Sequence, residues 1–218
     1  MTTRPGHSLA PAYFEALYAA QADPWDFAGS PYERDKYAHT LSVLRATPYD
    51  SVFEAGCSIG VLTRLLASRC RSLLSVDAAA TPLTAARARC SRLPHVRFER
   101  RELPREWPAG RFDLIVLSEI CYYWNRSDLL RAAKAAAESL TPAGEILLVH
   151  WTGETDYPLS GDEAAEFFIR SVRSTMQPVH QARRTGYRLD LLRGGEVRAG
   201  DPAAAPPPRS PPPAREAG

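Results

Sequence analysis

The most restrictive feature of the sequence is an alternation of short apolar runs with longer amphipathic stretches between residues 51 and 151. The run LIVL within 112–118 is what a strand covered on both faces requires. Strands that alternate with helices at this spacing form a mostly parallel sheet with right-handed crossovers. The sequence therefore predicts a doubly wound α/β fold with helices on both faces. The expected strands are 51–55, 73–77, 96–100, 112–118 and 145–150, and the expected helices between them are 61–70, 81–93 and 127–140.

Two capping patterns flank this core. Ser30-Pro31-Tyr32-Glu33 combines a capping box with a proline at the first helical position, and Ser160 with Glu163 repeats the box. These signals predict helices up to residue 44 and over 164–176. We also expect 187–192 to be a final edge strand, paired with residues near 179–182.

Composition divides the chain into three regions. Residues 1–50 are helical and aromatic, and we expect them to form a lid over the α/β domain of residues 51–193. Residues 194–218 are rich in Pro and Ala, and seven of the 19 prolines lie between Pro202 and Pro213. Such a segment cannot bury enough apolar surface to fold, so we expect a disordered tail.

Bulk properties are those of an ordinary globular protein. The 218 residues include 24% charged side chains and a net charge of +2, with no apolar run of about 18 residues. The four cysteines are widely spaced, so we expect no metal site and a reduced, cytoplasmic protein. Only Lys36 and Lys134 among the 27 basic residues are lysines, and acidic residues are interspersed. We therefore expect no nucleic-acid partner and no membrane association.

A glycine loop follows the first expected strand. In open α/β sheets, ligands bind at the carboxyl ends of the strands, and Gly56 and Gly60 let the backbone turn sharply there. The dinucleotide pattern GxGxxG is absent because Ser58 stands two residues after Gly56. An adenosyl group without phosphates needs less from such a loop than a diphosphate does.

Carboxylates follow the next three strands. Asp77 stands where a carboxylate can accept both hydroxyl hydrogens of a ribose, although an isolated Asp at a strand end is more often simply solvated. Glu102 can accept from an adenine amino group with Leu103 packed on the purine, or it is a surface Glu among arginines. Glu119 ends a buried strand, where it has either a function or a salt-bridge partner.

This set of motifs resembles the class I S-adenosylmethionine-dependent methyltransferases. Within that class, residues 13–192 resemble the nodulation protein S family, whose members are similar to N-methyltransferases acting on a deacetylated glucosamine amine of a chitooligosaccharide. The segments that carry this resemblance are Asp23–Trp25, Ser30–Glu33 with Lys36-Tyr37, Gly56–Gly60, His150-Trp151 and Asp156–Leu159. The cofactor implied is S-adenosyl-L-methionine, with a small-molecule or oligosaccharide acceptor.

The expected site has two parts. Trp25 and Tyr32 would close over the cofactor. Tyr122, Tyr123, Trp151 and Tyr157 follow the fourth and fifth strands, where aromatic rings suit a pyranose face, although some of them are expected to be packing residues. The residues expected to hold the cofactor are Glu54, Ala55, Gly56, Cys57, Gly60, Asp77, Ala78, Glu102, Leu103, Ser118, Trp25 and Tyr32.

An amine acceptor must lose its proton before it is methylated. Glu119 and His150 are the candidate proton acceptors, although a histidine satisfied by the backbone is at least as common. Three alternatives stay open. One is methylation of another small amine or hydroxyl, one is a nucleotide-dependent oxidoreductase on the same fold, and one is a module that binds the cofactor without transfer. Ser58 and the lack of a Tyr/Lys pair at helical spacing after the fourth strand argue against the oxidoreductase.

Overall fold

The computed structural model describes residues 4–194, which form one seven-stranded sheet in the order β3-β2-β1-β4-β5-β7-β6. Strands β1 to β5 are all parallel, and β7 runs antiparallel to both β5 and β6. The predicted doubly wound, mostly parallel α/β fold is confirmed. The strands are β1 (Val52–Ala55), β2 (Leu73–Asp77), β3 (Val96–Arg100), β4 (Phe112–Ser118), β5 (Leu140–Trp151), β6 (Met176–Arg184) and β7 (Tyr187–Gly194).

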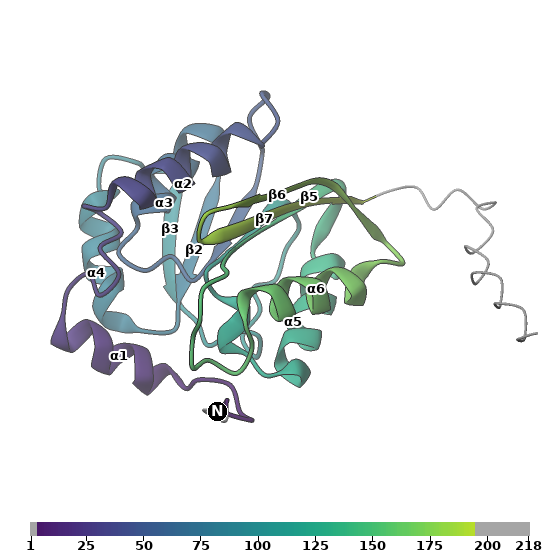
Figure 1. Cartoon of the computed structure of the whole chain (residues 1–218). Coiled ribbons are helices and arrows are strands. Elements are labelled where there is room, and N and C mark those ends of the chain that lie inside the picture. The colour runs from purple at the N-terminus through teal and green to yellow at the C-terminus, as the bar shows by residue number, and fades with distance from the viewer. Residues whose placement is uncertain (1–3, 195–218) are drawn as a thin grey trace, which may run out of the picture.

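Helices cover both faces of the sheet. Figure 1 shows α2, α3 and α4 on one side and α5 and α6 on the other, while α1 lies along the lower edge of α4. The helices are α1 (Pro11–Ala20), α2 (Pro31–Ser42), α3 (Val61–Leu66), α4 (Ala80–Arg89), α5 (Arg126–Glu138) and α6 (Gly161–Val172), with short 3₁₀ helices η1 (Ala67–Arg69) and η2 (Cys121–Tyr123).

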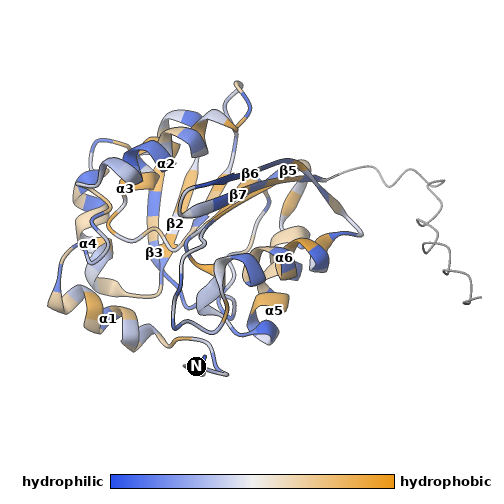
Figure 2. Ribbon diagram, viewed as in Figure 1, coloured by the Kyte–Doolittle hydropathy of each residue, from blue (hydrophilic) through white to orange (hydrophobic). Residues whose placement is uncertain are grey.

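The core has two layers because side chains alternate across each strand. In β4, Leu114 and Val116 pack under α2 and α3, whereas Ile115 and Leu117 pack under α5 and α6. All four are fully buried, which explains the uninterrupted apolar run in the sequence. Helices α5 and α6 carry alternating blue and orange segments in Figure 2, as expected for helices with one buried face.

Several predicted boundaries were wrong for local reasons. Helix α4 begins at Ala80, one residue before the expected start, with Ala79 at the N-cap and Thr81 inside the helix. Helix α5 begins at Arg126 instead of residue 127, because the Asn125 side chain caps it by accepting from the Asp128 backbone N–H. The hairpin of β6 and β7 forms as expected, but β7 lies inside the sheet and β6 is the edge strand.

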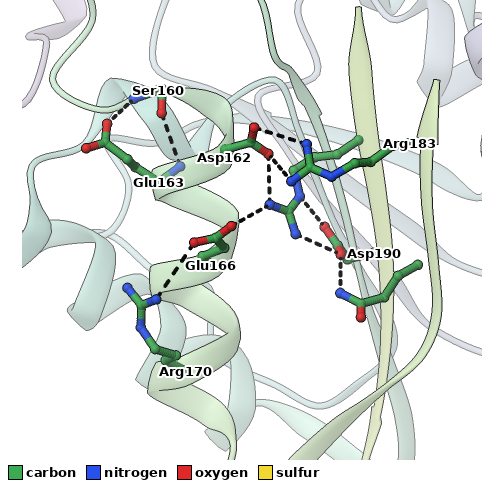
Figure 3. A network of polar contacts seen from close by, with 9 residues as sticks. Ser160, Asp162, Glu163, Glu166, Arg170, Arg183 and Asp190 are labelled. Carbon is green, nitrogen blue, oxygen red and sulfur yellow. Dashed lines mark hydrogen bonds and ion pairs between the residues drawn. The ribbon is translucent and has the colours of Figure 1, made fainter. Parts of the chain in front are cut away.

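A polar network fastens α6 to the hairpin (Figure 3). The buried Arg188 side chain on β7 bonds to Asp190 on its own strand and to Asp162 on α6, and Arg183 of β6 also reaches Asp162. The carboxylates compensate the buried guanidinium charge, which would otherwise be costly. The network therefore fixes α6 and the loop before it, which borders the site described below.

The predicted three-part division is only partly covered by the described residues. Residues 4–50 pack against the same body as the sheet, and Gly194 ends β7. The rest of the predicted disordered tail, residues 195–218, lies outside the described residues. Within 4–194, no helix is both long and apolar enough to span a membrane.

Candidate active site

Two adjoining chambers open at the carboxyl ends of the parallel strands. We call them the larger chamber, of about 390 Å³, and the smaller chamber, of about 320 Å³. The larger one is bordered by the loops after β1, β2, β3 and β4 and by residues 7–11 before α1. The smaller one lies between α2, the loop after β5 and η2. The residues that line both chambers are Trp25, Phe27, Glu119 and Tyr123.

The loop after β1 forms one wall of the larger chamber. Gly56 has a φ of +75°, and a Cβ there would come within 3.1 Å of the Ile120 side chain, so this turn requires glycine. Ser58 also adopts a left-handed conformation, with a φ of +50°. This conformation lets the Ser58 backbone N–H donate to Asp77 Oδ2 at 2.9 Å.

Asp77 ends β2 and is held by backbone donors on both oxygens. Its Oδ1 accepts from the Ala79 N–H at 2.9 Å, while Oδ2 accepts from Ser58. Each carboxylate oxygen keeps further lone-pair capacity for a ligand. Burial raises the pKa of the Asp77 carboxyl to about 6, so a ligand that donates hydrogen bonds to it would stabilise the charged form.

The other predicted cofactor residues divide into two groups. Nine of the twelve line the larger chamber, and three do not. Glu54 lines it, but its Oε2 accepts hydrogen bonds from the Thr63 and Ser75 hydroxyls. Burial raises the pKa of Glu54 to about 7. The residues on the chamber wall are Trp25, Glu54, Gly56, Cys57, Asp77, Ala78, Glu102, Leu103 and Ser118.

Glu102 and Leu103 lie side by side after β3. Leu103 is buried and its carbonyl accepts from the Trp124 indole N–H at 3.1 Å. The Glu102 carboxylate contacts only Arg105, at 3.9 Å, among the described residues. The carboxylate therefore keeps its acceptor capacity for a ligand that packs on Leu103.

Three expected cofactor residues lie elsewhere. Gly60 faces α4, where a Cβ would come within 2.9 Å of the Ala86 backbone, so this glycine serves helix packing. Ala55 is fully buried and lines neither chamber. Tyr32 lines the smaller chamber instead of the larger one. A role of these three residues in cofactor binding therefore stays a prediction that their placement does not support.

Aromatic side chains surround the smaller chamber. Tyr122 and Tyr157 stack with ring centroids 5.3 Å apart, and Trp151 meets Tyr32 edge to face at 5.9 Å. All four aromatic residues predicted to bind the acceptor, Tyr122, Tyr123, Trp151 and Tyr157, line this chamber. Trp124, in contrast, lines the larger chamber.

A buried lysine joins two carboxylates at this chamber. Lys36 on α2 donates to Glu33 Oε1 at 2.9 Å and to Glu119 Oε1 at 2.6 Å, and its side chain is only 2% exposed. Burial alone would lower the pKa of Lys36, but the two carboxylates more than offset this effect and raise it. The lysine is therefore charged, and both carboxylates are oriented by it.

Both oxygens of Glu119 already accept hydrogen bonds. Its Oε1 accepts from Lys36, and its Oε2 accepts from the Tyr122 hydroxyl at 2.7 Å and from the Trp151 N–H at 2.8 Å. Burial would raise the pKa of Glu119, yet Lys36 above all, and the Trp151 N–H after it, lower that pKa below its usual value. Glu119 is therefore a stable carboxylate at the junction of the two chambers, and a weak proton acceptor.

His150 does not face either chamber, which contradicts its expected role as a proton acceptor. It is fully buried in β5, and its Nε2 accepts from the Cys121 N–H at 3.2 Å. Burial lowers its pKa to about 4, so the ring is neutral near pH 7. No cluster of three or more His, Cys, Asp or Glu suited to a metal occurs within residues 4–194.

Sequence reasoning missed residues on three elements. Lys36 and Glu33 were assigned to a helix and its cap, and only the pattern of a basic residue three positions after an acidic one could have linked them. Phe14 and Tyr18 of α1, with residues 7–11, line the larger chamber without any sequence signal. Tyr18 donates to the Ser58 hydroxyl and so supports the glycine loop.

A search of protein families matches residues 16–151 to the family described as nodulation protein S (NodS). The chain belongs to this family. The matched range contains the whole set of strand-end loops that build the larger chamber. Glu33, Lys36 and Glu119 also lie inside the matched range.

Similar proteins agree with this assignment. Nodulation protein S of Rhizobium tropici is 28% identical over 130 residues, which cover 59% of this chain and 55% of that protein. The chain thus matches less than two thirds of the length of its curated relatives. A solved Pseudomonas syringae protein, described as a candidate methyltransferase, is 36% identical with a TM-score of 0.66, covering 74% of this chain and 98% of that one.

The fold also matches a NodS crystal structure. The N-methyltransferase NodS of Bradyrhizobium japonicum WM9, solved with S-adenosyl-L-homocysteine, superposes with a TM-score of 0.75 at 22% identity. The match covers 86% of this chain and all of the other. At this level of identity the match establishes the fold.

Proposed function

We propose that this protein is an S-adenosyl-L-methionine-dependent N-methyltransferase whose acceptor is an amine of an amino sugar or oligosaccharide. The observation that carries the proposal is the pairing of the two chambers across Glu119 and Tyr123. The larger chamber offers the groups that a nucleoside needs, and the smaller one offers aromatic walls with a net negative charge. The NodS relatives support the same reaction class.

The larger chamber fits the cofactor through this chain's own donors and acceptors. Asp77, with its lone pairs free beyond two backbone bonds, would accept from the ribose hydroxyls, and hydrogen bonds to a charged acceptor contribute about 1.5–3 kcal/mol each. Glu102 and Leu103 would bind the adenine. When bound, the cofactor would supply a transferable methyl group carried on a cationic sulfur.

The N-terminal region would act as a lid, as expected from the sequence. Trp25 and Phe27 line both chambers, and the Leu9 N–H donates to the Tyr123 carbonyl, so this segment borders both ligands at once. Exclusion of water by such a lid strengthens the electrostatic interactions inside. Placement of two reactants in one site contributes roughly 7–11 kcal/mol in well-oriented reactions.

Glu119 would act by position and charge. It lies on the walls of both chambers, so its carboxylate stabilises positive charge where the acceptor meets the methyl group. We expect Glu119→Gln to lower turnover more than cofactor affinity. Equal losses in both quantities would make Glu119 a cofactor-binding residue instead.

The proposal is tested with methyl-labelled cofactor and two matched acceptors, a glucosamine tetramer and its N-acetylated counterpart. Label should pass to the free amine and not to the acetylated sugar. Transfer to both would indicate a hydroxyl acceptor. No transfer to either, with cofactor bound, would remove the amino-sugar acceptor from the proposal.

A further inference from the structure

The smaller chamber contains a buried carboxylate oxygen without a hydrogen-bond partner. Glu33 is 6% exposed, and its Oε1 accepts from Lys36, but its Oε2 has no partner among residues 4–194. Buried polar atoms are nearly always paired, so such an atom on the wall of a chamber indicates a missing ligand group. We propose that Glu33 Oε2 binds the acceptor's ammonium group and takes its proton. This inference rests on the function proposed above.

The charges of the chamber support this role. Two buried carboxylates, Glu33 and Glu119, share one buried cation, Lys36, which leaves one negative charge without compensation. A buried unpaired charge is costly, and a single ammonium would neutralise this one. A neutral hydroxyl or acetamide would not. The chamber is therefore selective for an acceptor that arrives as a cation.

The two carboxylates differ in their capacity for a proton. Glu119 accepts three hydrogen bonds, at least one on each oxygen, and its pKa lies below its usual value. For Glu33, burial is the main influence and raises the pKa, although Lys36 and the neighbouring Tyr37 oppose it. A carboxylate with a raised pKa and a free oxygen is the better general base.

The backbone around Glu33 is also consistent with a function outside the helix cap. Ser30 accepts from the Glu33 N–H at 3.4 Å, as in a capping box, but the Glu33 side chain bonds to Lys36 and does not return to Ser30. Two other buried polar atoms in the chamber, Tyr32 Oη and Thr155 Oγ1, also lack partners within the described chain. All three residues line the chamber, so their unpartnered atoms are the candidate contacts of a polar ligand such as an amino sugar.

The proton step balances as a transfer within the chamber. The N–H bond of the ammonium breaks, its electron pair stays on nitrogen, and the proton forms an O–H bond with Glu33 Oε2. The neutral amine then holds the lone pair that methylation requires, and Glu33 returns its proton to solvent when the product leaves. The groups that face Glu33 during this step are Tyr32, Lys36 and Tyr37 on α2 and Glu119 after β4.

The experiment compares Glu33→Gln with the matched control Glu154→Gln, which removes an exposed carboxylate that lines neither chamber. Turnover is measured with the glucosamine tetramer as a function of pH, and S-adenosylhomocysteine binding by calorimetry. Glu33→Gln should lower kcat about 100-fold near pH 7, with a kcat that rises as pH rises because water must then remove the proton. Affinity for S-adenosylhomocysteine, and every property of the control, should match the wild type.

A measurement on the wild type alone gives a second readout. Binding of the glucosamine tetramer to the S-adenosylhomocysteine complex is measured in two buffers of different ionisation enthalpy, at a pH where the free amine is protonated. Transfer of the proton to Glu33 predicts no net proton release. Release of about one proton per amine bound would overturn the inference even if Glu33→Gln failed to fold.

The outcomes separate this inference from the proposed function. A wild type that methylates the tetramer, together with a Glu33→Gln variant of unchanged kcat and pH profile, would overturn the role of Glu33 and leave the function intact. A wild type that binds S-adenosylhomocysteine but neither binds nor methylates the tetramer would overturn both the amino-sugar acceptor and the role of Glu33.

Discussion

Helices α2 and α6 begin with the same Ser-x-x-Glu pattern, yet the two glutamates have different environments. At α6, Glu163 accepts from the Ser160 N–H at 2.9 Å and its own N–H donates to Ser160 Oγ at 3.2 Å, so the box is complete (Figure 3). At α2, the Glu33 carboxylate makes no bond to the Ser30 N–H; it accepts from Lys36 instead, and Glu33 lines the smaller chamber. One glutamate stabilises a helix, and the other lines a candidate site.

Exposure explains why the same pattern has two outcomes. The Glu163 side chain is 48% exposed, and burial raises the pKa of Glu33, whose side chain is 8% exposed. A capping box gives a helix about 1 kcal/mol, which is less than the cost of leaving a buried lysine unpaired. Lys36 therefore draws Glu33 away from the cap.

The largest expected effect on stability comes from the removal of Lys36, the cation that pairs with Glu33 at the start of α2. Lys36→Met should lower the free energy of unfolding by about 3–5 kcal/mol, because it leaves two buried carboxylates without a cation. Chemical denaturation measures the loss. The exposed Lys134 on α5 is the matched control, and Lys134→Met should change stability by less than about 0.5 kcal/mol. Equal effects of the two substitutions would contradict the buried charge cluster.

The next effect compares the two glutamates directly. Glu33→Gln should reduce turnover about 100-fold, whereas Glu163→Gln should leave turnover within about twofold, because Glu163 touches neither chamber. Steady-state kinetics with the glucosamine tetramer measures both variants. A similar loss in both would mean that the capping positions act through helix stability alone.

A third variant tests the larger chamber and should leave the N-termini of α2 and α6 unchanged. Asp77→Asn should weaken S-adenosylhomocysteine binding about 10- to 100-fold, since it replaces a charged acceptor of two ribose hydroxyls. Because burial raises the pKa of Asp77 to about 6 and binding favours the charged form, wild-type affinity should be full above that pH and fall as the pH drops through it. Calorimetry across pH measures both effects. A pH-independent affinity would remove Asp77 from the ribose site.

The smallest effect is that of the ordinary cap. Glu163→Ala should lower the free energy of unfolding by about 0.5–1 kcal/mol and leave ligand binding unchanged. Thermal denaturation measures the change. A loss above about 3 kcal/mol would show that Glu163 takes part in the nearby Arg188 network as well as in the cap.

The sequence predicted the fold through local signals that tertiary contacts left unchanged. The bounds of β2, β3 and β4 match the expected strands, and the rule that ligands lie at strand ends brought Gly56, Asp77 and Glu102 to one chamber. Gly60 lies outside the lining of this chamber, and its positive φ serves close contact with α4, which no local pattern reveals.

The acceptor side was harder to predict because it depends on side-chain direction. His150 ends an apolar run, but strand alternation turns its ring into the core, while Trp151, the next residue, faces the smaller chamber. Lys36 was given no role in the site beyond its place in the expected helix, since a lysine is rarely buried without partners. Its partner Glu119 is 83 residues away in the sequence, and only the fold brings them together.

The central claim, that two chambers meet at Glu119 and hold donor and acceptor, is tested most directly by a crystal structure with S-adenosylhomocysteine. The account predicts the adenosine in the larger chamber, with its ribose hydroxyls on Asp77 and its adenine beside Glu102 and Leu103. The sulfur should point toward Glu119 and the smaller chamber. A ligand bound outside this chamber, or bound with its sulfur turned away from Glu119, would contradict the account.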